Sequence, residues 1–208
     1  YALASKIPML EPADSKECKE YTKLAYELSE KYDTPVFIRL STRVSHSQSM
    51  VELCERSEVE LKPYVKDASK YVMMPGNAKK RHVFVEERCE KLAEYAETSE
   101  INSIEFNSDE IGVITSGISY MYAKEALGNK ASYLKLGMVY PMPAEKIKEF
   151  ASKCKKVYVI EELDPFIETY CRSLGIEVIG KEKFTLLGEY TPKMIKKAVL
   201  SKEWYEYT

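Results

Sequence analysis

The stretch Ile111-Gly112-Val113-Ile114-Thr115-Ser116-Gly117-Ile118-Ser119-Tyr120, which runs on through Leu127 to Gly128, decides the fold. Its first half is a short apolar run bounded by turn residues, a pattern typical of a strand covered on both faces. The turn Thr115-Ser116-Gly117 leaves backbone N–H groups free at the start of a helix, where an anion or a polar group can bind. Ser116 and Gly117 are therefore candidate ligand-binding residues. Alternatively, they form an ordinary strand-to-helix turn that binds no ligand.

On both sides of this stretch, apolar runs alternate with amphipathic stretches. We expect strands over 104–106, 111–115, 131–136, 157–160 and 176–179, and helices ending at Leu127 or starting near Pro143, Asp164 and Thr191. Strands that alternate with helices predict an α/β fold with a mainly parallel sheet and flanking helices.

The first 40 residues carry a second unit of the same kind. An apolar piece over 7–10 precedes Asp14, and Asp14 with Glu17 forms a capping-box pattern at a helix start. The helix is predicted to end near Asp33, and residues 36–40 read as the next strand. Strand, helix and strand with short joints predict a βαβ unit.

Between these units, residues 55 to about 80 are rich in charges and are interrupted by Pro63, Pro75 and Gly76. We interpret this part as a linker with little regular structure, followed by a helix from about His82 to Glu97. The predicted division is 1–54, 55–99 and 100–208, with the middle range being linker plus helix.

The charge balance excludes some functions. The 208 residues contain 31 Lys and Arg against 33 Asp and Glu, a net charge of −2, which argues against a nucleic-acid-binding surface. The five cysteines form no CxxC pair, which disfavours a disulfide framework or a local metal motif and favours a reduced, cytoplasmic setting. No apolar run approaches the roughly 20 residues of a membrane helix.

Three small clusters are candidates for chemistry. Ser45 and His46 follow a predicted strand end, where open α/β sheets bind ligands, although a hydroxyl-rich turn holding a hydrogen-bonded histidine also explains them. Glu161, Glu162 and Asp164 follow another strand end and could perform acid–base chemistry or bind Mg²⁺. Alternatively, Asp164 caps the next helix and the carboxylates complement its dipole.

The third cluster is basic. Lys79, Lys80 and Arg81 could meet a phosphate-bearing ligand or a partner, or they could form a solvated stretch before a helix. The sequence contains no GxSxG, P-loop, HExxH or GxGxxG motif. From these residues alone, the chain is an α/β protein without a complete active site.

Several segments together resemble one family, the large (alpha) subunit of indolepyruvate ferredoxin oxidoreductase. The resemblance covers nearly the whole chain, in order and at compatible spacing. Its segments are Leu10-Glu11-Pro12 with Asp14, residues 32–36, Arg43-Val44-Ser45-His46-Ser47, residues 71–75 with Asn77-Ala78 and Arg81-His82, Ile114 to Tyr120, residues 134–138, and Glu161 to Glu168.

The resemblance implies a thiamine-diphosphate enzyme with Mg²⁺ and [4Fe-4S] clusters. That family converts arylpyruvates and coenzyme A to arylacetyl-CoA and CO₂, and it passes electrons to ferredoxin with the help of a beta subunit. Residues 1–54 would be the end of the pyrimidine-binding domain, and residues 100–208 a domain similar to the transketolase C-terminal domain. Lys79, Lys80 and Arg81 would then be candidates to meet a phosphate of CoA.

The chain also departs from that family. The family's pyrimidine-side glutamate is expected upstream of Tyr1, and neither a Gly-Asp-Gly motif nor clustered cysteines occur here. We therefore expect a middle fragment that holds no cofactor, no catalytic residue and no metal, is inert alone, and serves structure and interfaces against the rest of the alpha subunit. The alternatives are a fragment of a pyruvate or branched-chain 2-oxoacid relative, or a free-standing α/β binding module.

Overall fold

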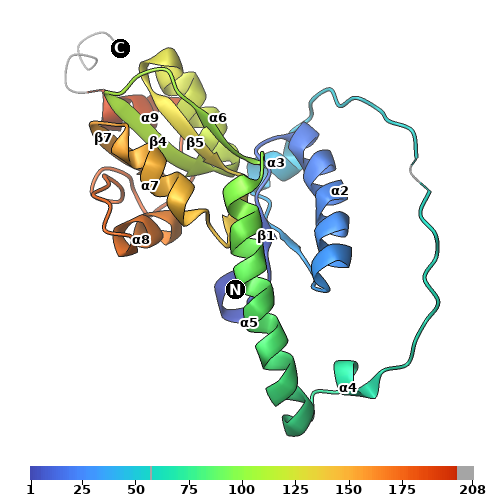
Figure 1. The fold of residues 1–208 in the computed structure, drawn as a ribbon. Helices are drawn as coiled ribbons and strands as arrows, with labels where there is room; N and C mark the ends of the chain where they lie inside the picture. The colour runs from blue at the N-terminus through green and yellow to red at the C-terminus, as the bar shows by residue number, and fades with distance from the viewer. Residues whose placement is uncertain (57, 201–208) are drawn as a thin grey trace.

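The computed structural model describes residues 1–56 and 58–200 (Figure 1). The larger of its two sheets has the strand order β3 (Asn102–Glu105), β5 (Ser132–Leu136), β4 (Ile111–Ser116) and β7 (Lys156–Ile160). β4 pairs in parallel with β5 and β7, whereas β3 is antiparallel to β5 at the edge. The predicted central strand is therefore confirmed as an interior strand of a mainly parallel sheet.

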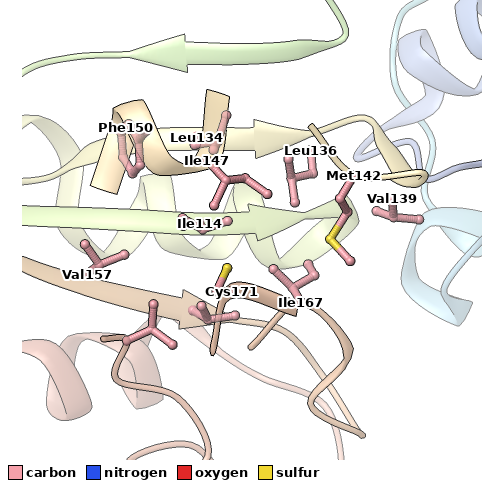
Figure 2. Packing of buried hydrophobic residues seen from close by; sticks show 12 residues of the cluster. Ile114, Leu134, Leu136, Val139, Met142, Ile147, Phe150, Val157, Ile167 and Cys171 are labelled. Atoms are coloured by element: carbon pink, nitrogen blue, oxygen red, sulfur yellow. The ribbon is translucent and has the colours of Figure 1, made fainter. Parts of the chain in front are cut away.

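Helices cover both faces of this sheet, as predicted. On one face, α7 (Ala144–Ser152) and α8 (Phe166–Ser173) bury Phe150, Ile167 and Cys171 against Ile114 of β4 and its neighbours (Figure 2). On the other face, α6 (Gly117–Leu127) and α9 (Pro192–Val199) pack against Val113 and Tyr133. Alternate residues of β4 point to opposite faces, so both of its faces are buried.

The smaller sheet has the order β2 (Phe37–Ile38), β1 (Met9–Leu10) and β6 (Met138–Tyr140). β1 and β2 are parallel and are joined by α2 (Ser15–Tyr32), which confirms the βαβ unit. Asp14 caps α2 by accepting the N–H of Glu17 at 2.8 Å. The Glu17 carboxylate reaches one residue further back than expected and accepts the N–H of Ala13.

β6 was not predicted. The sequence pattern predicts that the strand over 131–136 ends at Gly137 and that the next helix starts near Pro143. The chain instead leaves the larger sheet at Gly137 and continues as β6, antiparallel to β1. The division at residues 54 and 99 stays a prediction, and this pairing ties its first and last ranges together.

The long helix α5 (Pro75–Thr98) begins earlier than the sequence pattern predicts. Pro75 and Gly76 indicate an interruption, and the predicted helix start near His82 is wrong. Pro75 occupies the first turn, where a missing N–H removes no intrahelical bond. A short α4 (Ala68–Tyr71) precedes it, and residues 47–56 and 58–67 contain neither helix nor strand. The irregular character predicted from residue 55 therefore holds only as far as Asp67.

Two smaller elements precede the long loop, namely α1 (Ala2–Ser5) and α3 (Thr42–His46). A 3₁₀ turn, η1 (Gly128–Lys130), follows α6. The strand expected over 176–179 is reduced to one parallel bridge between Ile179 and Tyr158. The helix start predicted at Thr191 is confirmed, because the Thr191 hydroxyl accepts the N–H of Met194.

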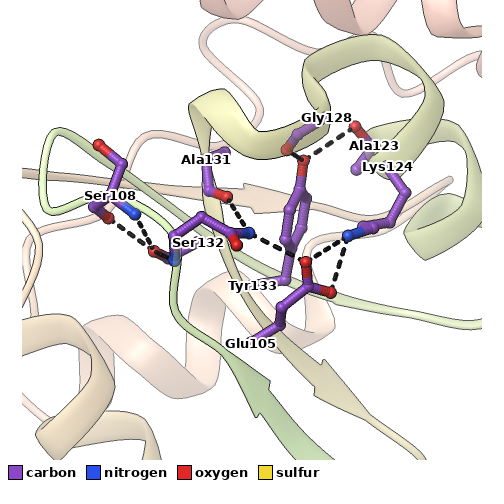
Figure 3. A network of polar contacts seen from close by, with 9 residues as sticks. Glu105, Ser108, Ala123, Lys124, Gly128, Ala131, Ser132 and Tyr133 are labelled. Atoms are coloured by element: carbon purple, nitrogen blue, oxygen red, sulfur yellow. Dashed lines mark hydrogen bonds and ion pairs between the residues drawn. The ribbon is translucent and has the colours of Figure 1, made fainter.

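A polar network fastens the open edge of the larger sheet to α6 (Figure 3). The Ser132 hydroxyl accepts the N–H of Ser108 and donates to its carbonyl, at 2.9 and 2.6 Å. Lys124 of α6 pairs with Glu105 of β3, and the Tyr133 hydroxyl donates to the Gly128 carbonyl at 2.7 Å. These contacts hold β3, β5 and α6 together at the edge of the sheet.

Within residues 1–56 and 58–200, no helix is both long enough and apolar enough to cross a membrane.

We expect Phe150→Ala to lower the free energy of unfolding by about 3–5 kcal/mol, because it opens a cavity between α7 and the sheet at a fully buried position. Leu187→Ala, at a residue that is 81% exposed, should change it by less than about 0.5 kcal/mol. Urea denaturation of both variants checks this, and equal losses would contradict the packing described for α7.

Candidate functional site

A cavity of about 510 Å³ lies where the carboxyl ends of β1, β2, β4 and β7 meet. Strand ends at such a junction are where open α/β sheets bind ligands. Its polar side chains come from the strand ends and from the residues that follow them, and these are Glu11, Arg39, Ser41, Ser116, Ser119, Glu161, Glu162 and Asp164. Apolar lining is supplied by α1 and α8, through residues such as Leu3, Phe166 and Ile167.

Glu11 directly follows β1 of the smaller sheet and lines the cavity as a buried acid. It is 8% exposed, and the Arg39 guanidinium donates to its carboxylate at 2.5 Å. Burial raises the pKa of Glu11, while the Arg39 charge and the Ser116 hydroxyl act in the opposite direction. The ion pair therefore compensates a carboxylate that water hardly reaches.

Gly117 makes this arrangement sterically feasible. Its φ is +51°, in the region that residues with a side chain rarely adopt, and a Cβ there would lie 2.6 Å from Oε1 of Glu11. Ser116, the last residue of β4, is buried and makes no side-chain cap to α6. The predicted Ser116-Gly117 turn thus receives the Glu11 carboxylate of the same chain.

Glu161 has a structural task. Its carboxylate accepts the N–H groups of Ile167 and Glu168 at 2.8 and 2.9 Å, which satisfies the first turn of α8. Burial raises the pKa of Glu161, and these two backbone donors lower it. The expectation that Asp164 caps this helix is wrong: Pro165 is the N-cap residue, and Glu161 supplies the carboxylate from the strand end.

Glu162 is also engaged, because it accepts the N–H of Tyr190 at 2.8 Å. Lys181 joins this group from the far side, donating to the Glu161 carbonyl and to the Tyr190 hydroxyl. The acids at the end of β7 therefore tie the C-terminal loop and α8 to the sheet.

The remaining sequence candidates lie elsewhere. Ser45 and His46 are exposed at the end of α3 and do not line the cavity. Lys79, Lys80 and Arg81 lie in the first turns of α5, where Arg81 pairs with Asp33 at 3.3 Å. Of the candidate residues, Ser116 lines the cavity together with Glu161, Glu162 and Asp164, and Gly117 lies next to Ser116. Any ligand role for the candidate residues stays a prediction.

Glu11 and Arg39 were missed as site residues. Part of the signal was present, since Glu11 directly follows a predicted strand and the carboxyl ends of parallel strands meet at one edge of a sheet. Arg39 was placed inside the strand predicted over 36–40, whereas β2 ends at Ile38. The sequence did not show that the ends of β1 and β2, in the smaller sheet, lie next to the end of β4 in the larger sheet.

The chemistry of the lining limits what the cavity can hold. Four carboxylates face one guanidinium, a balance that disfavours an anionic diphosphate group and favours hydrogen-bond donors. Among the described residues, no three His, Cys, Asp or Glu side chains are grouped as a metal would require, and the five cysteines are dispersed. These residues fit neither the diphosphate of thiamine diphosphate with its Mg²⁺ nor an iron–sulfur cluster.

Comparisons with known proteins identify relatives by sequence. The chain is 38% identical over 187 residues to indolepyruvate oxidoreductase subunit IorA of Archaeoglobus fulgidus, covering 87% of the chain and 30% of that subunit. The IorA subunits of Methanothermobacter thermautotrophicus and Thermococcus kodakarensis are 37% and 35% identical over 96% of the chain. The chain spans about a third of the length of these relatives, and no protein-family model matches it.

Two solved structures share the fold of the chain. A 2-oxoglutarate:ferredoxin oxidoreductase from Magnetococcus marinus, solved with 2-oxoglutarate, coenzyme A and succinyl-CoA bound, matches 91% of the chain and 41% of its own at a TM-score of 0.65 and 19% identity. A split-gene transketolase, described as an inactive beta4 tetramer, matches 93% of the chain and 56% of its own at a TM-score of 0.50 and 14% identity. The α/β fold is thus shared with both enzymes.

We expect Gly117→Ala to destabilise the chain more than Gly175→Ala. Both positions have positive φ, which costs about 1–2 kcal/mol for alanine, but only at Gly117 does the new Cβ meet the Glu11 carboxylate. The extra loss should shrink when Glu11→Ala is added to Gly117→Ala, and not when it is added to Gly175→Ala. Additive losses in both pairs, measured by urea denaturation, would contradict the close approach of Glu11.

Proposed function

We propose that this chain, which is homologous over nearly its whole length to about a third of indolepyruvate oxidoreductase subunit IorA, is a segment of the large subunit of a 2-oxoacid:ferredoxin oxidoreductase. The observation that carries the proposal is the combination of 35–37% identity over 96% of the chain with the fold of a 2-oxoacid:ferredoxin oxidoreductase. A fold alone supports many functions, so the sequence identity decides the assignment.

The proposed reaction is that of the family which the sequence resembles, and the relatives' name supports indolepyruvate as its substrate. The complete enzyme is proposed to convert indolepyruvate or another arylpyruvate, with CoA and oxidised ferredoxin, to arylacetyl-CoA, CO₂ and reduced ferredoxin. Thiamine diphosphate would supply the carbanion chemistry at the oxoacid carbon, and [4Fe-4S] clusters would carry the electrons, both bound outside this chain. The expected partners are a beta subunit, ferredoxin and the rest of the large subunit.

The part played by this chain is structural. The acids around the cavity are used within the fold: Glu11 with Arg39, Glu161 at α8, and Glu162 at Tyr190. Because these three acids are engaged within the fold, we assign the chain a structural role with no chemical step on them. It would join the smaller sheet to the larger one and present surfaces to the rest of the subunit.

The test is an activity assay of the complete large subunit together with its partner subunit. We expect reduction of ferredoxin, or of a viologen dye in its place, that requires both CoA and an arylpyruvate. Higher kcat/KM with pyruvate, a branched-chain oxoacid or 2-oxoglutarate would contradict indolepyruvate as the substrate and keep the enzyme class. No oxoacid-dependent reduction with any of them would contradict the class and favour a free-standing α/β binding module.

We further expect that thiamine diphosphate with Mg²⁺ does not raise the melting temperature of the 208-residue chain, because its cavity is lined by carboxylates. Differential scanning calorimetry with and without the cofactor measures this, and the complete large subunit is the positive control. A saturable rise with the 208-residue chain would show that the cofactor site lies within it and would refute the segment's proposed inert role.

A further inference from the structure

Two neighbouring cavities share part of their walls. The first, here called the polar cavity, is the space of about 510 Å³ at the strand ends. The second, here called the apolar cavity, has a volume of about 590 Å³ and lies between residues 140–142 and α8. Leu3, Asp164 and Phe166 line both cavities, so the two spaces meet at these three residues. Met142, in the wall of the apolar cavity, lies near the tip of β4 (Figure 2).

The two cavities differ in the chemistry of their walls. Carboxylates and hydroxyls dominate the polar cavity. The apolar cavity is lined mainly by aromatic, proline and other apolar side chains, namely Tyr140, Pro141, Met142, Pro165, Phe166 and Tyr170. A molecule that fills both spaces therefore has a polar end and a flat apolar end.

The carboxylate that lies where the cavities meet has no partner in the fold. Glu11 is paired with Arg39, and Glu161 and Glu162 accept backbone N–H groups. The Asp164 carboxylate, by contrast, accepts no hydrogen bond and forms no ion pair with any residue that the structure describes. Its negative charge favours a cationic group at the junction of the two cavities.

A buried hydroxyl in the polar cavity also lacks a partner. Ser119, in the first turn of α6, is only 4% exposed, and its hydroxyl makes no hydrogen bond within residues 1–56 and 58–200. Buried polar side chains are nearly always hydrogen-bonded, so an unpartnered hydroxyl in a cavity wall indicates a polar group within that cavity. Ser119 and Asp164 thus both offer acceptors for N–H groups.

We propose that the joined cavities bind a primary aromatic amine, with its ammonium group at Asp164 and its ring in the apolar cavity. Phe166 stands at the junction, where an aromatic side chain attracts both a cation and a second ring. The volume of the apolar cavity is within the range of small-molecule sites and is ample for a phenyl or indole ring. The site is separate from the oxoacid reaction and does not rest on the proposed function.

Other ligand classes fit these walls less well. An arylpyruvate or arylacetate has a similar ring but carries a carboxylate, which the charge of Asp164 repels. A metal ion finds no group of three ligating side chains among the described residues. An aliphatic amine satisfies Asp164 and leaves the aromatic wall of the apolar cavity without a partner. Only an aromatic cation uses both cavities.

Isothermal titration calorimetry of the 208-residue chain with phenethylamine and with tryptamine tests the proposal. We expect each amine to bind saturably, with one molecule per chain. Butylamine, which lacks the ring, and phenylpropionate, which has a carboxylate in place of the ammonium group, should each bind at least tenfold more weakly than phenethylamine.

Variants locate the two ends of the site. Asp164→Asn should raise the dissociation constant of phenethylamine at least tenfold. Asp109→Asn, the same charge change at an exposed residue just before β4, should leave it unchanged. Thr169→Trp should also weaken binding at least tenfold, because Thr169 is an exposed residue in the wall of the apolar cavity and the new ring fills that space.

Circular dichroism of each variant checks that the fold is kept. Binding of neither amine would overturn the proposal, as would equal binding of butylamine or phenylpropionate. Binding of phenethylamine that either Asp164→Asn or Thr169→Trp leaves unchanged would place the amine elsewhere on the chain and would overturn it as well. None of these measurements involves an oxoacid, so their outcome is distinguishable from that of the activity assay.

Discussion

The fold depends on the close approach at Gly137, where the chain crosses from the larger sheet to the smaller one. A Cβ at this position would lie 2.5 Å from the Ile101 carbonyl and 2.4 Å from the Tyr21 hydroxyl. The Gly137 N–H donates to that carbonyl at 3.0 Å, and its own carbonyl accepts the N–H of Glu11 at 2.8 Å. One residue without a side chain therefore joins β5, β6 and β1 and sets the distance between the two sheets.

The position of the buried Glu11 carboxylate at the cavity depends on the distance between the two sheets. Once β1 is paired with β6, Glu11 has to lie against the end of β4, and Gly117 leaves the space for its carboxylate. A buried carboxylate is tolerated because Arg39, from the neighbouring strand end, supplies the opposite charge. The same logic holds across the cavity, where Glu161 is buried and satisfied by the backbone of α8. Glu161 and Glu162, which resemble an acid–base pair in the sequence, thus accept backbone N–H groups that hold the fold together.

The long helix α5 connects these parts to the exposed surfaces. Its C-terminal half is packed, with Ala96 in the core of the smaller sheet, and Glu97 accepts the N–H groups of Glu145 and Lys146 at the start of α7. Its N-terminal half carries exposed Val83 and Phe84. One half of α5 thus joins the core of the smaller sheet to the start of α7, and the other half is exposed.

The sequence by itself determined the elements whose patterns are local. The apolar run and turn at Ile111–Gly117 predicted an interior strand and its helix, and the caps at Asp14 and Thr191 located two helix starts, because such signals act within a few residues. Signals that act within a few residues also predict the βαβ unit, and short segments in a fixed order carry the resemblance to the family.

Only the tertiary structure decided what depends on distant partners. β6 is a strand because β1 offers it a ladder, and α5 is anchored because Ala96, near its C-terminal end, packs into the core of the smaller sheet. Glu11 and Arg39 became a pair through two strand ends that lie side by side, and Glu161 rather than Asp164 caps α8 because the strand delivers it there. None of these contacts has a signature within one stretch of sequence, since each is created by burial between segments far apart in the chain.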